Sequence, residues 1–322
     1  MKSGINLSLV TSIGAGLLAA VCANASERVS LATVLNPLGY EQIELRRTEG
    51  NHLFLFGQLN GRRRSCLVDT GWSFTSIATN VASGLQFCGA TPRDAFFESD
   101  ERSPAMRIES LKLGRVAFVN QPALAPASFT DSSGDTFDVV LGCDFLLRHF
   151  AVIGCAARRL YTRRAATSSE DQKIFADALR RAGFQEIALT CKRPLALTCA
   201  VRVNGQPLEM LVDTGAVWSC LDARQCERLG VKALPSPARI TGAGKTGTRP
   251  VSVAEAKSFR LGEVELRNAN LALFDLSDWG FAAPGKALSE VQGILGGEIL
   301  AATGAVIDCH TMKLWLKPPS RR

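Results

Sequence analysis

The sequence is poor in the residues and motifs on which most metal sites and serine hydrolases depend. Its 322 residues include three histidines, none of them near cysteines at a spacing typical of zinc ligands, and no Cys-x-x-Cys pair. The Gly-x-Ser-x-Gly motif of serine hydrolases does not occur. We therefore expect no metal, no other cofactor and no nucleophilic serine.

Nucleotide and nucleic-acid binding also lack support. The segment Gly-Ala-Gly-Lys-Thr-Gly resembles part of a phosphate-binding loop, but that motif requires glycine at position 239, which is Arg239. The formal charge is +7, and the arginines fall in short clusters without interleaved aromatic residues. We interpret these clusters as solvated loops, and we expect no nucleic-acid partner.

Long apolar runs are confined to the N-terminus. Lys2 precedes an apolar segment over residues 5–21, and Ala23-Asn24-Ala25 fits a signal-peptidase site. We predict a signal peptide over residues 1–25, with cleavage near Ala25 and a periplasmic or secreted mature chain. An uncleaved membrane anchor is the alternative. No later segment has the length and hydrophobicity of a membrane span, so we predict none in the mature chain.

Cysteine is abundant, and export would place the chain where disulfides persist. Ten cysteines become nine once the signal peptide is removed. Cys191 and Cys199 bracket a short segment that a disulfide could close, and Cys220 and Cys226 are also near each other in the sequence. Buried free thiols are an equal alternative, because spacing does not determine connectivity.

The chain is a tandem repeat. The segment 60–71 aligns without a gap on 204–215, an offset of 144 residues that brings Leu-Val-Asp-Thr-Gly onto an identical copy. Further along, 138–146 aligns on 292–300 at an offset of 154. We predict two equivalent lobes, 26–166 and 167–322, joined at a polar junction around Ser168.

Each repeat has the pattern of a small β unit preceded by a short helix. Asn60-Gly61 and Asn204-Gly205 lie between β-type runs and predict tight hairpins. Residues 169–182 predict an amphipathic helix that ends at Gly183, and Pro37 shortens its counterpart in the first unit. Many short strands in each unit predict a mostly β fold, either a small barrel or a sandwich.

The repeated Asp-Thr-Gly suggests acid–base chemistry. An aspartate at the end of a buried strand is disfavoured as an anion, and two such carboxylates brought together hold one shared proton. The ionised member can take a proton from water, and the protonated member can donate one to a substrate carbonyl. Asp69 and Asp213 are the candidates for this pair. Glycine permits a tight turn beneath them.

These motifs resemble those of the retropepsin-like aspartic peptidases. Leu-Val-Asp-Thr-Gly is followed about 70–80 residues later by Val-Val-Leu-Gly in one unit and Gly-Ile-Leu-Gly in the other, and the resemblance covers almost the whole mature chain. It implies two tandem β-barrel lobes related by pseudo-two-fold symmetry, fused in one chain as in exported bacterial members. It also implies a catalytic pair, Asp69 and Asp213, supported by Thr70, Gly71, Thr214, Gly215, Gly142 and Gly296.

The resemblance further implies a flap, a hairpin that closes over the substrate. The candidate in the second lobe includes Gly242, Ala243 and Gly244, and the corresponding region of the first lobe is shorter and charged. One departure concerns the residue after Asp-Thr-Gly, usually small in the family. It is Ala216 in the second unit but Trp72 in the first, where an indole could crowd or shape the first substrate pocket.

Taken together, the residues and the resemblance predict an aspartic endopeptidase that acts on polypeptides as a monomer with paired lobes. The alternatives are a catalytically inactive peptide-binding module of the same fold and a homodimer whose lobes pair between chains. Asp144 and Glu298 occupy equivalent positions after the Leu-Gly, and we expect them to cap the short helix that follows rather than to act in catalysis.

Overall fold

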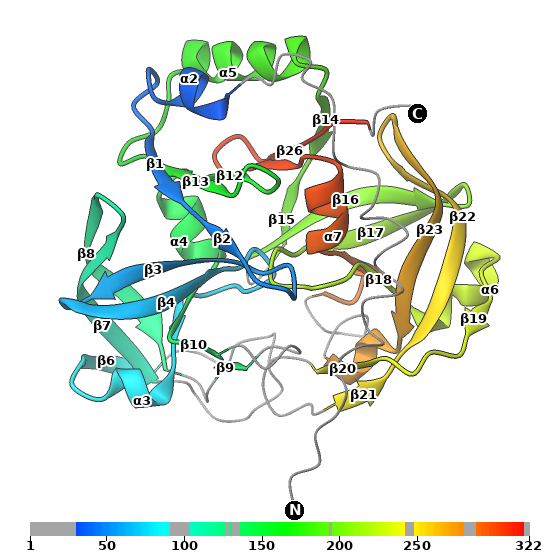
Figure 1. The fold of residues 1–322 in the computed structure, drawn as a ribbon, viewed down its shortest axis with the longest axis horizontal. Helices are drawn as coiled ribbons and strands as arrows, with labels where there is room; N and C mark the ends of the chain where they lie inside the picture. Colours follow the sequence, from blue (N-terminus) through cyan, green and yellow to red (C-terminus); the bar gives the residue numbers. More distant parts are fainter. Residues whose placement is uncertain are drawn as a thin grey trace, which may run out of the picture.

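The structure is a computed structural model that describes residues 30–90, 104–125, 129–130, 136–192, 195–241, 248–279 and 288–318. It is mostly β, with two strand-rich lobes side by side and a helical layer at one end (Figure 1). The proposed signal peptide and the flap candidates Gly242, Ala243 and Gly244 lie outside the described residues. None of the helices in the described ranges is both long and apolar enough to cross a membrane.

The first lobe is a six-stranded barrel. Its strands follow one another round the sheet as β3 (Leu53–Leu59), β4 (Arg62–Val68), β11 (Val139–Leu141), β5 (Ser76–Ile77), β8 (Val116–Leu124) and β7 (Pro104–Leu113). The barrel closes because β7 pairs back with β3, Leu59 opposite Leu111. Outside the ring are β2 (Arg46–Arg47), β6 (Gln86–Ala90), α3 (Thr79–Ala82) and the short pair β9 (Phe129–Thr130) and β10 (Thr136–Phe137).

The second lobe repeats this barrel. The ring runs β16 (Ala196–Val203), β17 (Gln206–Val212), β24 (Gly293–Leu295), β18 (Cys220–Asp222), β23 (Val264–Phe274) and β22 (Ser252–Leu261), and β22 pairs back with β16. The additional elements are β15 (Thr190–Lys192), η2 (Ala223–Gln225), α6 (Cys226–Leu229), β19 (Ala233–Leu234), β20 (Arg239–Thr241), β21 (Thr248–Pro250) and η3 (Leu276–Trp279). The fold class predicted from the sequence, two tandem barrels, is confirmed.

The predicted hairpin turns explain how each barrel begins. Asn60 and Gly61 both have positive φ, 47° and 78°, and Asn204 and Gly205 repeat this with 48° and 84°. Two successive positive φ values match a two-residue turn to the right-handed twist of its strands, and Asn-Gly is the preferred pair. In β3 buried and more exposed side chains alternate, so one face of the hairpin lines the barrel.

A six-stranded sheet joins the lobes, in the order β1 (Glu41–Glu44), β13 (Arg159–Thr162), β12 (Val152–Gly154), β25 (Val306–Asp308), β26 (Lys313–Leu316) and β14 (Gln185–Ala188). At its centre Ile153 pairs with Ile307, its equivalent at the offset of 154. A pseudo-two-fold axis therefore passes between β12 and β25. The repeat pattern had not indicated this sheet, in which each unit's opening strand pairs with its own closing strand.

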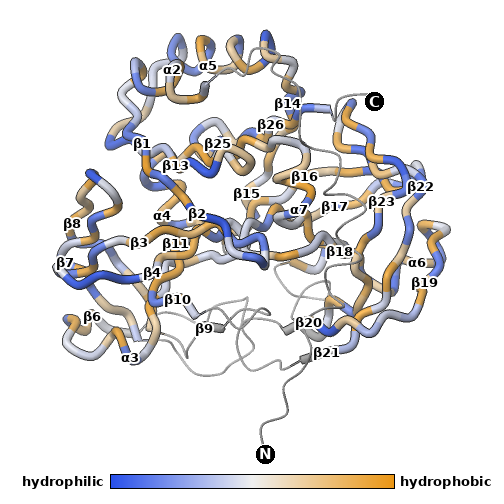
Figure 2. Tube along the Cα trace, viewed as in Figure 1, coloured by the Kyte–Doolittle hydropathy of each residue, from blue (hydrophilic) through white to orange (hydrophobic). Residues whose placement is uncertain are grey.

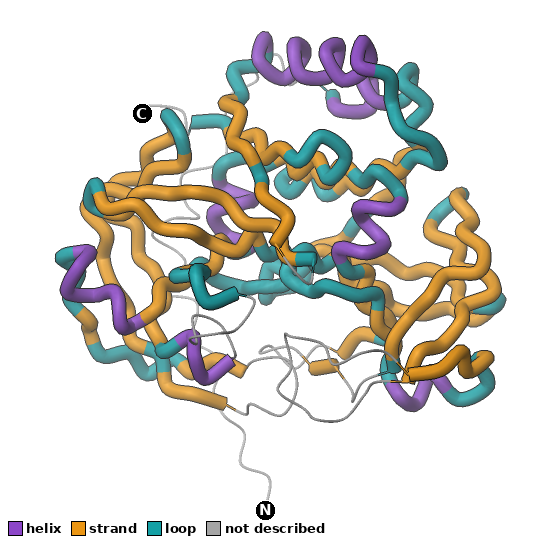
Figure 3. Tube along the Cα trace, turned by 180° about the vertical axis from the view of Figure 1, so that it is seen from behind, coloured by secondary structure: helices purple, strands orange, loops and turns teal. Residues whose placement is uncertain are grey.

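Two helices cover the outer face of this sheet, α2 (Leu31–Leu35) and α5 (Ser169–Arg181) (Figures 1 and 3). In α5 the N-cap Ser168 accepts a hydrogen bond from the Asp171 amide and Asp171 returns one, a capping box. Hydrophobic and hydrophilic positions alternate along α5 (Figure 2), and Phe175 and Leu179 pack with Trp315 of the sheet. The shorter helices α4 (Cys143–Arg148) and α7 (Gly297–Ala302) follow the Leu-Gly of each unit.

The core is continuous across both barrels and the joining sheet, since one cluster of buried side chains includes residues of all three. It contains several of the thiols. All nine cysteines after the proposed signal peptide are unpaired, which agrees with the free-thiol alternative and not with the suggested disulfides. Of these, Cys88 and Cys191 are exposed, Cys226 is half-buried, and the other six are buried.

Candidate active site

The two Asp-Thr-Gly loops follow equivalent strands, β4 and β17. Each strand pairs in parallel with the strand that carries the later Leu-Gly, β11 or β24. The Asp69 amide donates to the Leu141 carbonyl at 3.1 Å, and the Asp213 amide donates to the Leu295 carbonyl at 3.0 Å. The strands therefore end at the same edge of each barrel, and the loops face each other where the lobes meet, at the centre of Figure 3.

The threonines interlock the loops. The Thr70 hydroxyl donates to the Val212 carbonyl at 2.7 Å and accepts from the Thr214 amide at 3.0 Å. The Thr214 hydroxyl donates to the Val68 carbonyl at 2.7 Å and accepts from the Thr70 amide at 3.0 Å. Both threonines are buried. Each hydroxyl thus satisfies one carbonyl and one amide of the opposite lobe, which fixes the lobes relative to each other.

The structure brings the carboxyl groups of Asp69 and Asp213 together, each against the glycine of the opposite loop. Each also accepts from its own loop. The Gly71 amide donates to Asp69 Oδ1 at 2.8 Å, and the amides of Gly215 and Ala216 donate to Asp213 Oδ1 at 2.7 and 3.0 Å.

Glycine is required beside each aspartate because the opposite carboxyl group occupies the space of a side chain. A Cβ atom on Gly71 would overlap the Asp213 carboxyl group, and one on Gly215 would overlap that of Asp69. The two aspartates can therefore approach each other because Gly71 and Gly215 have no side chains.

Burial raises the pKa of both carboxyl groups, and their proximity acts on the two in opposite directions. The pKa of Asp69 is raised well above its ordinary value, first by burial and then by the charge of Asp213 and the hydrogen bond to it. The pKa of Asp213 is raised by burial and lowered in part by the Gly215 amide, Asp69, the Ala216 amide and His52. A pair of this kind holds one shared proton over a wide pH range.

Gly142 and Gly296 lie under the loops. A Cβ atom on Gly142 would come within 2.8 Å of the Trp72 carbonyl oxygen, and one on Gly296 within 2.7 Å of that of Trp218. The next residues hold the loops through their amides. Cys143 N donates to the Trp72 carbonyl and Gly297 N to the Ala216 carbonyl, both at 2.8 Å. Close backbone approach explains why each unit has glycine after the apolar run.

Trp72 is anchored in the first barrel. Its indole Nε1 donates to the Ser76 hydroxyl at 2.9 Å, and the ring packs against the cluster of Leu67, Phe137 and Val140. The side chain is half-buried. The second lobe has only the methyl group of Ala216 at this position, so the walls beside the two aspartates differ.

The N-cap residues of α4 and α7 are Gly142 and Gly296, so Asp144 and Glu298 lie in the first turn and not at the cap position. Asp144 Oδ1 accepts from the Phe145 amide of that turn at 2.7 Å, which agrees in part with the expected capping. Asp144 also accepts from the Thr75 amide and hydroxyl at 2.6 and 2.7 Å, and Glu298 accepts from the Ser219 amide at 2.6 Å. Thr75 and Ser219 follow the aspartate loops. These carboxyl groups therefore fix the segment that follows each aspartate loop by hydrogen bonds.

Of the proposed flap, only the two flanking strands fall within the described residues. In the second lobe β20 and β21 pair antiparallel, with Thr241 opposite Thr248, on either side of the proposed flap residues. Its counterpart in the first lobe, near residues 93–104, lies almost entirely outside the described ranges.

His52 is a further residue of the site, one that the repeated motifs did not indicate. Its Nε2 lies 2.8 Å from the carbonyl oxygen of Gly215, so this first-lobe side chain reaches the second aspartate loop. The signal was present in the alignment, because at the offset of 144 His52 falls opposite Ala196, and the repeat is broken beside the motif.

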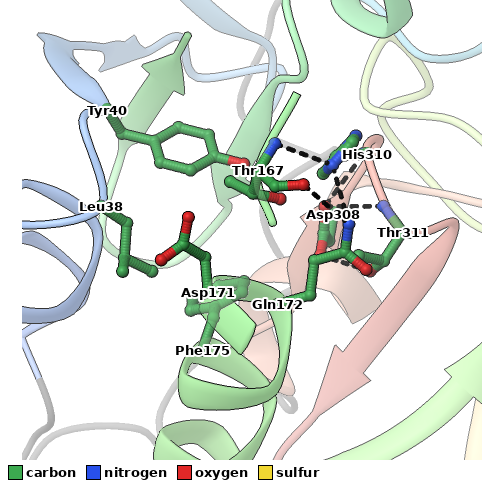
Figure 4. Close-up of a pocket in the computed structure, with 9 residues that line it drawn as sticks. All are labelled: Leu38, Tyr40, Thr167, Asp171, Gln172, Phe175, Asp308, His310 and Thr311. Atoms are coloured by element: carbon green, nitrogen blue, oxygen red, sulfur yellow. Dashed lines mark hydrogen bonds between the residues drawn. The ribbon is translucent and has the colours of Figure 1, made fainter. Parts of the chain in front are cut away.

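A separate small cavity lies between the helical layer and the joining sheet (Figure 4). Tyr40, Asp171, Gln172, Asp308 and His310 are among its lining residues. Its volume is about 10 Å³, enough for a single water molecule. Asp308 is already bonded to the amides of His310 and Thr311 and to the Thr311 hydroxyl. We therefore interpret this cavity as structural. Across the described ranges no three His, Cys, Asp or Glu side chains converge as metal ligands would.

Two barrels that contribute one aspartate each to a single site define a two-lobed aspartic protease fold. A family model described as aspartyl protease matches residues 56–145 and 199–299. These matches cover more than half of the chain, which therefore belongs to the retropepsin-like aspartyl protease family, as the sequence motifs predicted. No curated protein matches the sequence significantly.

Among solved structures, an aspartic proteinase from Irpex lacteus is 14% identical, with a TM-score of 0.50, over 88% of this chain and 98% of that one. At this identity the likeness shows the fold alone. A retropepsin-like aspartic protease from Rickettsia conorii is 18% identical, with a TM-score of 0.28, over 38% of this chain and 89% of that one.

Proposed function

We propose that this chain is an aspartic endopeptidase in which Asp69 and Asp213 activate a water molecule against a peptide bond. The observation that carries the proposal is the meeting of the Asp69 and Asp213 carboxyl groups on interlocked loops, each against the glycine of the opposite loop. Two carboxyl groups in contact, both with pKa values raised by burial, are typical of a catalytic acid–base pair.

The chemistry follows from one shared proton. The ionised aspartate accepts a proton from water while the water oxygen bonds to the substrate carbonyl carbon. The protonated aspartate donates its proton to the carbonyl oxygen, which gives a neutral tetrahedral diol. As the diol collapses, the C–N bond breaks, the amine nitrogen takes a proton from one aspartate, and a diol hydroxyl returns a proton to the other. The pair is then restored.

One chain supplies both loops, which favours a complete site in a monomer over pairing between chains. The substrate class we propose is extended polypeptide, from the family to which the chain belongs. We also propose export, with a signal peptide over residues 1–25, on the sequence pattern alone. N-terminal sequencing of the chain recovered outside the cytoplasm tests it, and an intact residue 1 would contradict it.

The test of activity is cleavage of an unfolded protein by the purified chain without residues 1–25, from about pH 4 to 7. Asp69→Asn and Asp213→Asn should each abolish cleavage. Asp177→Asn removes a half-buried carboxylate on α5 that pairs with Lys173 and Arg180, and it serves as the matched control with activity retained. Cleavage that survives in either dyad variant would refute the shared pair.

An inactive peptide-binding module is the second candidate, and Trp72 is the observation that favours it. An inactive wild-type chain that still binds a pepstatin-like peptide would support this reading. Trp72→Ala would then be the variant in which to look for recovered cleavage.

A further inference from the structure

His52 is held in one orientation beside the second aspartate loop. It follows Asn51, which has a positive φ of 65° and turns the chain into β3. The His52 side chain is 2% exposed, and Nε2 lies 2.8 Å from the Gly215 carbonyl oxygen. A carbonyl oxygen only accepts, so Nε2 carries the hydrogen. On the other side of the ring, Nδ1 lies 3.4 Å from the Thr48 hydroxyl.

The peptide that His52 contacts leads directly to Asp213. The Gly215 carbonyl belongs to the same peptide unit as the Ala216 N–H, and that N–H donates to Asp213 Oδ1 at 3.0 Å. Hydrogen bonds connected in series polarise one another, so a donor on the carbonyl strengthens the N–H as a donor. His52, the Gly215–Ala216 peptide and Asp213 therefore form one chain of hydrogen bonds from the first lobe to the second aspartate.

The repeat contains this arrangement once. The residue equivalent to His52 in the second unit is Ala196, whose methyl group cannot donate a hydrogen bond. We propose that His52 is a positioning residue that breaks the symmetry of the pair and makes Asp213 its ionised member, through the Gly215–Ala216 peptide. This inference rests on the proposed function, and it assigns Asp213 as the acceptor of the water proton and Asp69 as the donor to the substrate carbonyl.

The electrostatics agree with this assignment. Burial and the charge of Asp213 raise the pKa of Asp69 well above its ordinary value. Burial also raises the pKa of Asp213. Loop amides oppose the rise in pKa at both carboxyl groups, those of Gly71 and Trp72 at Asp69 and those of Gly215 and Ala216 at Asp213. His52 adds to this opposition at Asp213 alone. Among the charged groups near His52, Asp213 lies beyond the Gly215–Ala216 peptide, and Arg47 donates to the carbonyl of the preceding residue, Asn51, at 2.9 Å.

The first test compares His52→Leu, which removes the donor, with His52→Gln, whose amide nitrogen can replace Nε2. We expect His52→Leu to lower kcat about tenfold, with KM unchanged. We also expect the acid limb of its kcat/KM profile to move to higher pH by roughly half a unit to one unit. His52→Gln should restore most of both. His149→Leu, which changes a half-buried histidine bonded to Gln121, is the control and should leave the profile unchanged.

The second test does not depend on cleavage. The NMR signal of the His52 Nε2–H should follow the ionisation of the pair in the wild-type chain, and this dependence should disappear in Asp213→Asn. The signals of His149 and His310 serve as internal references.

The outcomes separate the two proposals. An active wild type whose His52→Leu variant is less stable but has the same pH profile would overturn the role of His52. An inactive wild type would refute the proposed function. The change of the His52 Nε2–H signal with ionisation of the pair would then test only whether His52 is coupled to Asp213. A His52 signal that is unchanged in Asp213→Asn would overturn the inference in either case.

Discussion

Glu298 gives the sharpest prediction about stability and pH. Its Oε1 accepts from the Ser219 amide at 2.6 Å, whereas Oε2 is buried with no hydrogen-bond partner. The residue as a whole is half-buried, but the charge would sit on the carboxyl oxygens. Burial raises the pKa of Glu298 from 4.5 to about 7, although hydrogen bonds from Ser219 and from nearby amides act against this shift. The folded chain therefore keeps a proton on Glu298 that the unfolded chain has lost at pH 6.

The sign and size follow from that difference. Below pH 4.5 both states are protonated, and Glu298 imposes no penalty. Between pH 4.5 and 7 the folded state binds more protons than the unfolded state, so stability is lost as the pH rises. Above pH 7 the buried carboxylate is charged in the folded chain. A pKa of about 7 in place of 4.5 corresponds to a loss of up to about 3 kcal/mol.

The perturbation is Glu298→Gln, which keeps the acceptor for the Ser219 amide and cannot ionise. Urea unfolding at pH 4.5, 6 and 8 should show the wild type losing stability with pH more steeply than the variant, by up to about 3 kcal/mol over the range. Asp69, Asp213, Asp144 and Asp308 also have raised pKa values and contribute with the same sign, so the difference between the two proteins isolates Glu298.

Glu290→Gln is the matched control, because Glu290 is an exposed carboxylate paired with Lys192. It should retain the wild-type dependence on pH. Parallel curves for the wild type and Glu298→Gln would refute the reasoning, since they would mean that Glu298 ionises equally in both states.

Three further predictions concern the loops and the pair. Thr70→Val should lower the free energy of unfolding, measured in urea, by about 2–4 kcal/mol, because it leaves the Val212 carbonyl and the Thr214 amide without partners. Thr70→Ser should remain near wild type, and equal losses in the two variants would contradict this reasoning. Gly215→Ala should lower kcat by about a hundredfold or more, because the added methyl group would displace the Asp69 carboxyl group. Unchanged initial rates of cleavage of a quenched-fluorescence peptide would rule out this displacement. Cleavage should occur at acid pH and should slow as the pH rises through the raised pKa of Asp69, because the shared proton is lost there. A value of kcat/KM that keeps rising above pH 8 would exclude Asp69 as the proton donor.

Much of the fold was predictable because it depends on local patterns. Asn60-Gly61 and Asn204-Gly205 predicted hairpins, since few residues tolerate two successive positive φ values. The helix at Ser169–Arg181 followed from its N-cap and its apolar periodicity. The joining sheet could not be read in this way, because β1 and β14 are short and pair with strands more than a hundred residues away. The same limit applied to Asp144 and Glu298, whose partners lie across a loop rather than along the chain.

The repeat predicted the two-lobed organisation and one aspartate from each lobe in a shared site, because one carboxylate per unit needs a second unit. It left open whether the lobes pair within one chain or between two. Which side chains contact the two aspartate loops became clear only from the tertiary structure. It placed the Thr70 and Thr214 hydroxyls on the opposite backbones, and it brought His52 of one lobe to the Gly215 carbonyl of the other. These contacts join residues more than 140 positions apart, and no periodicity or spacing encodes such a distance. They exist only once both barrels have closed and the joining sheet has fixed one against the other.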